Sequence, residues 1–329
     1  MILRFKPVYK ERIWGGQNLK FKLNKIDLPA GSIGESWEIS AHKEGESVVA
    51  EGNFKGKSLS EIYRELGKEY FGARSENYSE FPLLIKFLDA VDDLSVQVHP
   101  DNDYARTHEN SMGKEEIWYV IDADPGSKLV YGLKEGVTRL QFEYDIKNGS
   151  VEDSLNYVDV KKDDIFFIPA GTVHAIGKGI QIAEIQQSSD ITYRVFDYDR
   201  IDKNGSKRQL HIEKSLDVIN FEFENKPLVE DVVENSEMFT VKSHARSEHF
   251  STDLIDLDSD TPVKYELNHD SFEILICIEG SFEIDSYEEN CSDLEEEKSV
   301  RLQCGDTVLL TVEQKYSIKG SGKLISAYI

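Results

Sequence analysis

The chain has 329 residues, of which 39% are hydrophobic and 30% charged, a composition typical of a globular protein with room for two domains. Its 38 Lys and Arg against 62 Asp and Glu leave a formal charge of -24, which argues against nucleic acid as a partner, because such binding depends on neutralising phosphates. No apolar segment approaches the roughly 20 residues of a membrane span, and the N-terminal residues lack the apolar stretch of a secretory leader, so we expect a soluble, cytoplasmic protein without a membrane partner.

Most of the chain alternates apolar and polar residues in short runs separated by Gly, Asp and Asn. This pattern predicts antiparallel strands with one buried face. Three short helices are expected at residues 58–71, 102–110 and 211–221. Several short strands at regular spacing in both halves favour an all-β-dominated fold of two jelly-roll-like barrels with a few short covering helices.

The first segment with chemical character is LSVQVHP, at residues 94–100. Side chains alternate between the faces of a strand, so Gln97 and His99 point the same way and Val96 and Val98 the other. An amide oxygen and an imidazole two residues apart can both reach one metal ion. Taken alone, a Gln and a His that only line a barrel would give the same pattern.

The second segment is GKEEIWYVI, at residues 113–121, whose apolar end predicts a strand. The alternation places Lys114, Glu116 and Trp118 on one face. If that face lines the same barrel, it brings a carboxylate and an ammonium into the cavity. The alternative is an exposed strand end with an ordinary Glu and Lys.

The third segment is DDIFFIPAGTVHAIG, at residues 163–177, in which an apolar strand leads through a Pro-Ala-Gly turn into a second strand with His174. The turn reverses the chain and presents His174 inward. Together with the earlier Gln-x-His and Glu, this spacing resembles the two-part metal motif of cupins. That motif usually supplies two His and a Glu first, so Gln97 in place of one His is a departure.

Beyond about residue 230 the sequence is nearly all strand-like, with SFEILICIEGSFEI predicting two strands around a turn at Glu279 and Gly280. We therefore expect a catalytic cupin domain at 1–228 and a C-terminal β domain at 229–329. The second domain has no comparable set of His and Glu, so we expect it to hold no metal.

Two smaller features belong to the same region. The acidic residues 288–298 (EENCSDLEEEK) predict a solvated loop. The three cysteines, Cys277, Cys291 and Cys304, lack CxxC spacing and are expected to be reduced, structural residues.

The order of the motifs resembles one cupin branch, the type I mannose-6-phosphate isomerases (phosphomannose isomerases) in their short bacterial form. The resemblance covers roughly residues 5–220 and rests on these motifs: WGG, IGESWEIS, SVQVHPDNDYA, GKEEIWYVI, FFIPAGTVHAIGKG and IAEIQQSSDITYRVFDYDR. It implies one zinc ion per chain, held by Gln97, His99, Glu116 and His174.

The resemblance also implies residues that act on the substrate. Lys114 matches the family's lysine two residues before the metal Glu, and Arg194 matches the active-site arginine of its S-D-x-x-x-R stretch. Glu184, in IAEIQQ, matches a cavity carboxylate. Ile176 stands where larger members often carry Tyr, so a role of that tyrosine does not transfer to this chain.

The implied activity interconverts mannose 6-phosphate and fructose 6-phosphate through a cis-enediol. A proton moves between C1 and C2, and a metal offers the positive partner that the developing oxyanion needs. Either Lys114 or Glu184 can act as the base, and the sequence does not decide between them. For the phosphate, Arg194 has suitable forked donors; Lys86 is a second candidate, with an ordinary paired lysine as the alternative.

Two other functions fit the same fold. A metal-dependent cupin oxygenase is one, although the missing His at position 97 counts against it. A sugar-phosphate-binding paralogue without turnover is the other, although Lys114, Glu184 and Arg194 are all present. The chain has no Walker A or GxGxxG motif, so no nucleotide site is indicated. A monomer and a homodimer both remain open.

Overall fold

The computed structural model describes the whole chain except residues 202–204, 225–230, 237, 268, 288–298 and 314. The chain is built mostly from strands in three sheets, which confirms the expected fold class. Among the described residues each sheet runs from one edge strand to another, so the sheets do not close into barrels. The loop predicted at 288–298, with Cys291, lies outside the described residues, and Cys277 and Cys304 are free thiols. No helix in the described ranges is long and apolar enough to cross a bilayer.

Two of the sheets face each other and form a sandwich. The six-stranded sheet has the order β10 (Ile165–Ile168), β7 (Glu116–Ala123), β12 (Ile180–Gln187), β5 (Leu83–Ala90), β3 (Ile33–Ser40) and β2 (Val8–Gly16). The five-stranded sheet has the order β13 (Tyr193–Phe196), β6 (Val96–Val98), β11 (His174–Ile176), β8 (Lys128–Leu133) and β9 (Leu155–Asp159). Side chains from both sheets share one apolar cluster, among them Leu88, Val120, Ile182, Leu129, Tyr131 and Ile176.

The third, nine-stranded sheet contains the last strands of the chain and two of the first. Its order is β14 (Asp231–Asn235), β15 (Phe239–Arg246), β16 (Ser251–Tyr265), β20 (Lys315–Tyr328), β17 (Glu273–Tyr287), β19 (Thr307–Leu310), β1 (Ile2–Lys6) and β4 (Val48–Val49), with β18 (Ser299–Gln303) also paired to β17. Strand β1 pairs antiparallel with β19, so the start of the chain is tied to the C-terminal sheet. The division at 228 and 229 remains a prediction.

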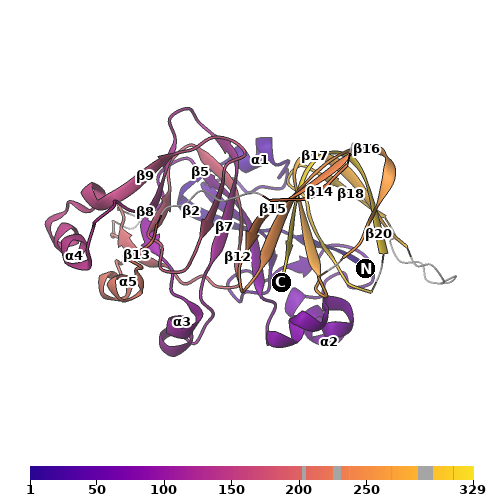
Figure 1. Cartoon of the computed structure of the whole chain (residues 1–329), viewed down its shortest axis with the longest axis horizontal. Coiled ribbons are helices and arrows are strands. Elements are labelled where there is room, and N and C mark those ends of the chain that lie inside the picture. Colours follow the sequence, from indigo (N-terminus) through magenta and orange to yellow (C-terminus); the bar gives the residue numbers. More distant parts are fainter. Residues whose placement is uncertain (202–204, 225–230, 237, 268, 288–298, 314) are drawn as a thin grey trace.

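The three predicted helices are present as α2 (Leu59–Phe71), α3 (Asn102–Glu109) and α5 (Ile212–Val218). Helix α2 begins with a capping box, in which Ser58 and Glu61 satisfy each other's backbone N–H groups. The sequence analysis missed α1 (Asn18–Lys22), α4 (Arg139–Asn148) and the 3-10 turns at Ala73–Asn77 and Val151–Ser154. Figure 1 shows α4 and α5 at the end of the molecule opposite the nine-stranded sheet.

The predicted turn at Glu279 and Gly280 is wrong. These residues lie inside β17, a single strand of 15 residues, and the pairing with β20 shifts by a bulge between Cys277 and Glu279. Gly280 has a φ of 79°, and a Cβ on it would collide with the carbonyl oxygen of Ser321 on β20. The glycine therefore allows two strands to approach closely instead of reversing the chain.

The inner strands β5 and β12 of the six-stranded sheet are buried on both faces, and the alternation of their side chains separates two environments. One face carries apolar side chains into the large core shared with the nine-stranded sheet, including Ile117, Tyr119, Ile185, Phe87, Ile274, Ile276 and Ile325. Figure 1 shows the strands of the two sheets next to each other at this junction. The opposite face carries the polar residues of the sequence motifs into the sandwich.

Candidate metal centre and active-site cavity

Four of the inward residues of the six-stranded sheet form a row across four strands. Trp37 pairs with Lys86, Lys86 with Glu184, and Glu184 with Trp118. Directly opposed residues project from the same face of a sheet, so their side chains meet. The register therefore places a carboxylate, an ammonium and two indoles side by side on the wall of the sandwich.

The five-stranded sheet carries a second row. Arg194 pairs with Gln97, Gln97 with His174, and His174 with Tyr131. His99 follows the end of β6, where its carbonyl accepts a hydrogen bond from the N–H of Gly171. That bond joins the first predicted motif to the Pro-Ala-Gly turn of the third.

His99, Glu116 and His174 converge between the two sheets. Their nearest ligand atoms all lie within 4.8 Å of one another, and all three side chains are buried. The Nε2 atom of His99 is 3.4 Å from Oε1 of Glu116, and Nε2 of His174 is 4.0 Å from Oε2. This is the only such group of three among the described residues. The structure thus brings together the three residues that the spacing placed on inward faces.

The two imidazoles are held ready to bind a metal through Nε2. Nδ1 of His99 donates to the carbonyl of Ile191 at 2.7 Å, and Nδ1 of His174 donates to the carbonyl of Thr172 at 2.9 Å. Such bonds fix the tautomer and leave Nε2 without a proton, so that it can accept a hydrogen bond or bind a metal. Burial, followed by the charge of Lys114, lowers the pKa of His99 to about 3, so its ring is neutral at physiological pH.

The other donors also fit a metal ion. Oε1 of Glu116 is buried without a hydrogen bond of good geometry, although the ammonium of Lys114 lies 2.5 Å away. The side-chain amide of Gln97 contacts Nε2 of His174 at 3.2 Å, and rotation of the amide by half a turn presents its oxygen there. Two imidazoles, a carboxylate and an amide oxygen are ligands that zinc and related divalent metals accept.

Charge balance keeps Glu116 ionised. Burial alone would raise its pKa, but the charge of Lys114 and the contact with His99 outweigh burial and hold the pKa well below its usual range. Glu184 behaves in the opposite way, because burial and then the nearby Glu116 raise its pKa, while its ion pair with Lys86 at 2.8 Å only partly compensates. Two buried carboxylates with divergent pKa values are typical of acid and base chemistry.

Trp118 links these two carboxylates. Its indole Nε1–H lies 3.0 Å from Oε2 of Glu116 and 3.1 Å from Oε2 of Glu184. The sequence placed Trp118 on the same face as Glu116 but gave it no role beyond the cavity wall. The missed signal is the cross-strand pairing of Trp118 with Glu184, which no local spacing reveals.

A cavity of about 620 Å³ lies beside this cluster, between the two sheets. The buried residues His99, Glu116, His174 and Trp118 do not line it themselves. The candidate residues Gln97, Lys114, Glu184, Arg194 and Lys86 all line it. The sequence analysis missed three further cations on its wall: Lys10, Arg12 and Arg208. Two of them come from β2 and one from the segment after β13, and none belongs to a motif with recognisable spacing.

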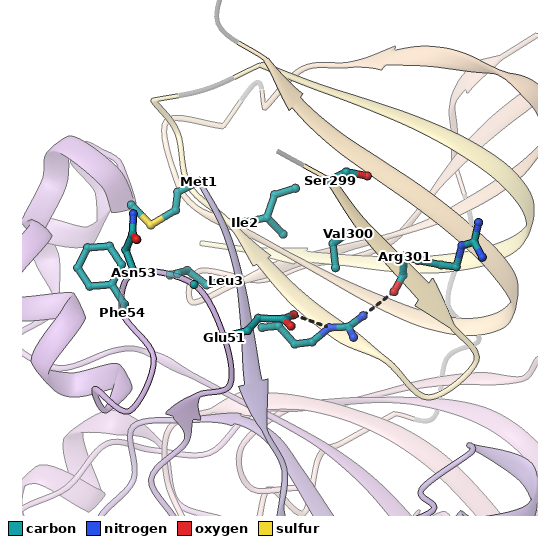
Figure 2. Close-up of a pocket in the computed structure, with 11 residues that line it drawn as sticks. Met1, Ile2, Leu3, Glu51, Asn53, Phe54, Ser299, Val300 and Arg301 are labelled. Atoms are coloured by element: carbon teal, nitrogen blue, oxygen red, sulfur yellow. Dashed lines mark hydrogen bonds and ion pairs between the residues drawn. The ribbon is translucent and has the colours of Figure 1, made fainter. Parts of the chain in front are cut away.

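A second cavity, of about 350 Å³, lies between β1, residues 51–54 and β18. Figure 2 shows Met1, Ile2 and Leu3 on one side of it and Val300 and Arg301 on another. An ion pair between Arg4 and Glu51 at 3.7 Å crosses its wall. No predicted site residue lines this cavity, and its wall holds no group of metal ligands among the described residues.

The mostly β fold and the buried cluster of two His and one Glu define a cupin-like protein with a candidate metal site. Residues 2–125 match the family model described as phosphomannose isomerase type I, catalytic domain. A Bacillus subtilis protein called putative mannose-6-phosphate isomerase YvyI is 36% identical over 325 residues, which are 98% of this chain and 97% of the relative. The chain therefore belongs to the type I phosphomannose isomerase family.

Two further comparisons agree. A mannose-6-phosphate isomerase of Streptococcus mutans is 51% identical over 209 residues, which are 64% of this chain and 65% of that protein. The crystal structure of mannose 6-phosphate isomerase from Bacillus subtilis superposes with a TM-score of 0.89 and 35% identity, and covers 100% of this chain and 99% of that one. The expected resemblance and the expected enzyme class, an aldose–ketose isomerase, are confirmed.

Proposed function

We propose that this chain interconverts mannose 6-phosphate and fructose 6-phosphate with one zinc ion held by Gln97, His99, Glu116 and His174. The observation that carries the proposal is the convergence of His99, Glu116 and His174 directly behind the cavity wall. Two residues that line the cavity contact this cluster: Lys114 lies 2.5 Å from Glu116, and Gln97 lies 3.2 Å from His174. The names of the relatives supply the substrate, and the cavity volume of about 620 Å³ falls within the range of small-molecule sites.

The chemistry requires one proton to move between C1 and C2 of the sugar. When bound, zinc supplies positive charge to the oxygens of these carbons, which favours the cis-enediol and its oxyanion. Lys114 lies two residues before the start of β7, and Glu184 lies on the neighbouring strand β12. We assign the proton transfer to this pair. Nζ of Lys114 is the donor or acceptor on the side of His99, at 3.2 Å from its Nε2.

The remaining residues orient these groups. Lys86 donates to Glu184 at 2.8 Å and is buried, so we assign it to holding that carboxylate and not to binding phosphate. Arg194 lines the cavity, has no hydrogen-bond acceptor at Nη2 among the described residues, and offers the forked donors that suit a phosphate. The cavity thus has a reacting end at Lys114 and Glu184 and an anion-binding side at Arg194.

The test is a coupled assay of the zinc-loaded full chain on mannose 6-phosphate, run beside His99→Ala with metal content measured in both. We expect the variant to lose zinc and its turnover to fall by at least about 100-fold, because metal polarisation contributes several kcal/mol to such reactions. The matched control is His108→Ala, which removes an exposed histidine of α3 and should keep both zinc and turnover.

Two outcomes would contradict the proposal. A folded, metal-replete wild type that forms no fructose 6-phosphate would favour a binding protein without turnover. Oxygen uptake on a candidate substrate, without isomerisation, would favour a cupin oxygenase.

A further inference from the structure

The cations on the cavity wall differ in what they contact. Three of them are neutralised by neighbouring carboxylates: Arg12 by Glu35 at 2.7 Å, Lys86 by Glu184 at 2.8 Å and Lys114 by Glu116 at 2.5 Å. A charge that is already paired has little left for a ligand. The remaining cations are Arg194 and Lys10, which form no ion pair among the described residues, and Arg208, which shares the carboxylate of Asp197 with Arg200. A carboxylate shared by two guanidiniums cannot neutralise both, so these three residues are the candidates for binding an anion.

Arg194 contacts only neutral groups. Its Nε donates to Oγ of Ser95 at 3.1 Å, and its Nη1 donates to the carbonyl of Gln209 at 2.9 Å. In the part of the chain that the structure describes, Arg194 forms no ion pair, and its Nη2 has no hydrogen-bond acceptor. Its guanidinium is thus positioned by two bonds and keeps both its charge and one free donor group.

Arg208 is positioned by the carboxylate of Asp197, which also binds Arg200. Its Nε donates to Oδ2 of Asp197 at 2.7 Å, and its Nη2 donates to Oδ1. Asp197 is only 5% exposed and also accepts from Nη2 of Arg200 at 2.5 Å. Nη1 of Arg208 has no acceptor among the described residues. One aspartate therefore orients two guanidiniums, and one of these two residues, Arg208, lines the cavity.

The two arginines are neighbours. Arg194 donates to the carbonyl of Gln209, the residue directly after Arg208, and both arginines line the same cavity. Burial and then the charge of Arg208 lower the pKa of Arg194, as expected for close like charges. The guanidiniums of Arg200 and Arg208 bind the carboxylate of Asp197, and Arg194 lies close enough for the charge of Asp197 to act on its pKa. Arg200 also pairs with Asp92 at 3.6 Å, so three guanidiniums stand against two carboxylates here, an excess of positive charge in a chain with a net charge of -24.

We propose that Arg194 and Arg208 together form a two-arginine clamp for the phosphate of the substrate, with Asp197 as the positioning residue for Arg208. This inference rests on the proposed function and extends it to a residue that the sequence motifs did not indicate. A phosphate monoester carries about -1.5 to -2 charges and three acceptor oxygens, which matches two guanidiniums that each keep a free donor group.

The placement suits a sugar phosphate. Arg194 lies on the strand beside Gln97, and Gln97 lies beside His174, so Arg194 is two strands, or about 10 Å between backbones, from the metal ligand. A hexose 6-phosphate carries its phosphate at the end of the carbon chain opposite to C1 and C2. The clamp and the reacting end can therefore be occupied at the same time.

Lys10 is the competing anion site. Its ammonium lies 4.5 Å from the ring centre of Trp37 and donates to the carbonyl of Glu44, without an ion pair among the described residues. A lysine is a point charge on a flexible stem, whereas two guanidiniums held by fixed acceptors are preorganised. This difference favours the arginine pair and provides a variant that separates the two sites.

The experiment measures inorganic phosphate as a ligand of the metal-loaded full chain, by calorimetry and as a competitive inhibitor of the isomerase. Arg208→Gln should raise the dissociation constant of phosphate and the KM for mannose 6-phosphate by about 10- to 100-fold, because a charge-assisted bond is lost. Arg208→Lys keeps the charge without the fork and should recover only part of this loss. Zinc content should remain that of the wild type in both variants.

The matched control is Lys207→Gln, which removes a positive charge from the neighbouring residue. Lys207 is 62% exposed, pairs with Asp199 and does not line the cavity, so both constants should stay within about twofold of the wild type. Unchanged constants in Arg208→Gln, full recovery in Arg208→Lys, or a larger effect of Lys10→Gln than of Arg208→Gln would each overturn the clamp.

The clamp and the proposed function fail in different ways. If the wild type binds phosphate through Arg208 but forms no fructose 6-phosphate, the clamp is supported and the isomerase proposal is wrong. If the wild type turns over mannose 6-phosphate and Arg208→Gln changes neither constant, the isomerase proposal is supported and the clamp is wrong.

Discussion

At the scale of single residues, Trp118 couples the candidate metal ligand to the candidate acid or base. One indole N–H is shared between Glu116 and Glu184, at 3.0 and 3.1 Å, in a place from which water is excluded. A hydrogen bond to an ionised group in such surroundings contributes about 1.5–3 kcal/mol. Trp118 is therefore a positioning residue, which acts through the two carboxylates it orients.

Replacing Trp118 by Phe should weaken zinc binding by about 10- to 100-fold, because it removes a bond that orients a ligand. Turnover at saturating zinc should fall as well, since Glu184 loses the same donor. A chelator competition series and a steady-state assay would measure the two effects. The control is Trp14→Phe, which alters another buried tryptophan of the cavity wall whose indole contacts neither carboxylate. Equal zinc affinity in both variants would leave Trp118 with a packing role only.

The sequence predicted the candidate site residues that belong to regular strand patterns, but not those, such as Arg208, that lie in connecting segments. Alternation along one predicted strand placed Gln97 and His99 on a common face, and alternation along a second placed Lys114 and Glu116 on a common face. In the structure Gln97 and Lys114 line the cavity, and Lys114 contacts both His99 and Glu116. Arg208 escaped prediction because its place depends on Asp197 and on the path of a connecting segment. A contact made by tertiary structure leaves no local period in the sequence.

At the scale of secondary structure, Glu279 and Gly280 show a case in which the local sequence pattern predicts the wrong element. A Glu-Gly pair between two apolar runs is a common hairpin signal, yet here the runs form one strand with a bulge. The reason lies on the neighbouring strand, where Gly320 and Gly322 on β20 face Phe282 and Gly280 on β17. Glycines that face each other on paired strands let the two backbones approach closely. The sequence of either strand alone does not predict this approach.

This close approach of the two strands predicts that Gly280→Ala strongly lowers the free energy of unfolding. The new Cβ would collide with the carbonyl oxygen of Ser321, and the φ of 79° is strained for alanine, so we expect the free energy of unfolding to fall by about 3 kcal/mol or more. Gly136→Ala is the matched control, because Gly136 has a φ of 82° but a Cβ added there would meet nothing within 4 Å. Gly136→Ala should lower the free energy of unfolding by about 1 kcal/mol. Chemical denaturation of both variants measures the difference, and equal losses would rule out the collision.

At the scale of the whole molecule, the nine-stranded sheet supports the cavity from behind. Ile117 and Tyr119 alternate with Glu116 and Trp118 along β7, so the strand that delivers the candidate metal ligand also enters the core shared with the C-terminal strands. Residues of β1 complete that sheet, since Leu3 pairs with Leu309 of β19. The sequence showed that strands were present in both halves, but not that the first strand joins the last ones, because pairing between the two ends of the chain has no local signature.

Stability of this shared fold should depend on pH through Glu273. Its side chain is 1% exposed at the start of β17, accepts hydrogen bonds from Tyr265 and Ser326, and burial raises its pKa to about 7. An unfolded glutamate titrates near pH 4.5, so the folded state binds the proton more tightly. The protonated carboxyl is therefore fully accommodated below about pH 4.5, and its contribution to stability is lost as the pH rises through 7, by about 3 kcal/mol in total.

Glu273→Gln should remove this dependence, because an amide cannot ionise while its oxygen still accepts from Tyr265 and Ser326. At pH 8 we expect the variant to unfold at a higher denaturant concentration than the wild type. At pH 5 the difference between the two denaturation midpoints should be smaller. The control is Glu283→Gln on the same strand, whose side chain is 32% exposed and paired with Lys319, and which should show no such narrowing. If this difference in denaturation midpoint were the same at pH 5 and pH 8, the pKa of Glu273 would be equal in the folded and unfolded chain. The shared core would then tolerate the charge of Glu273.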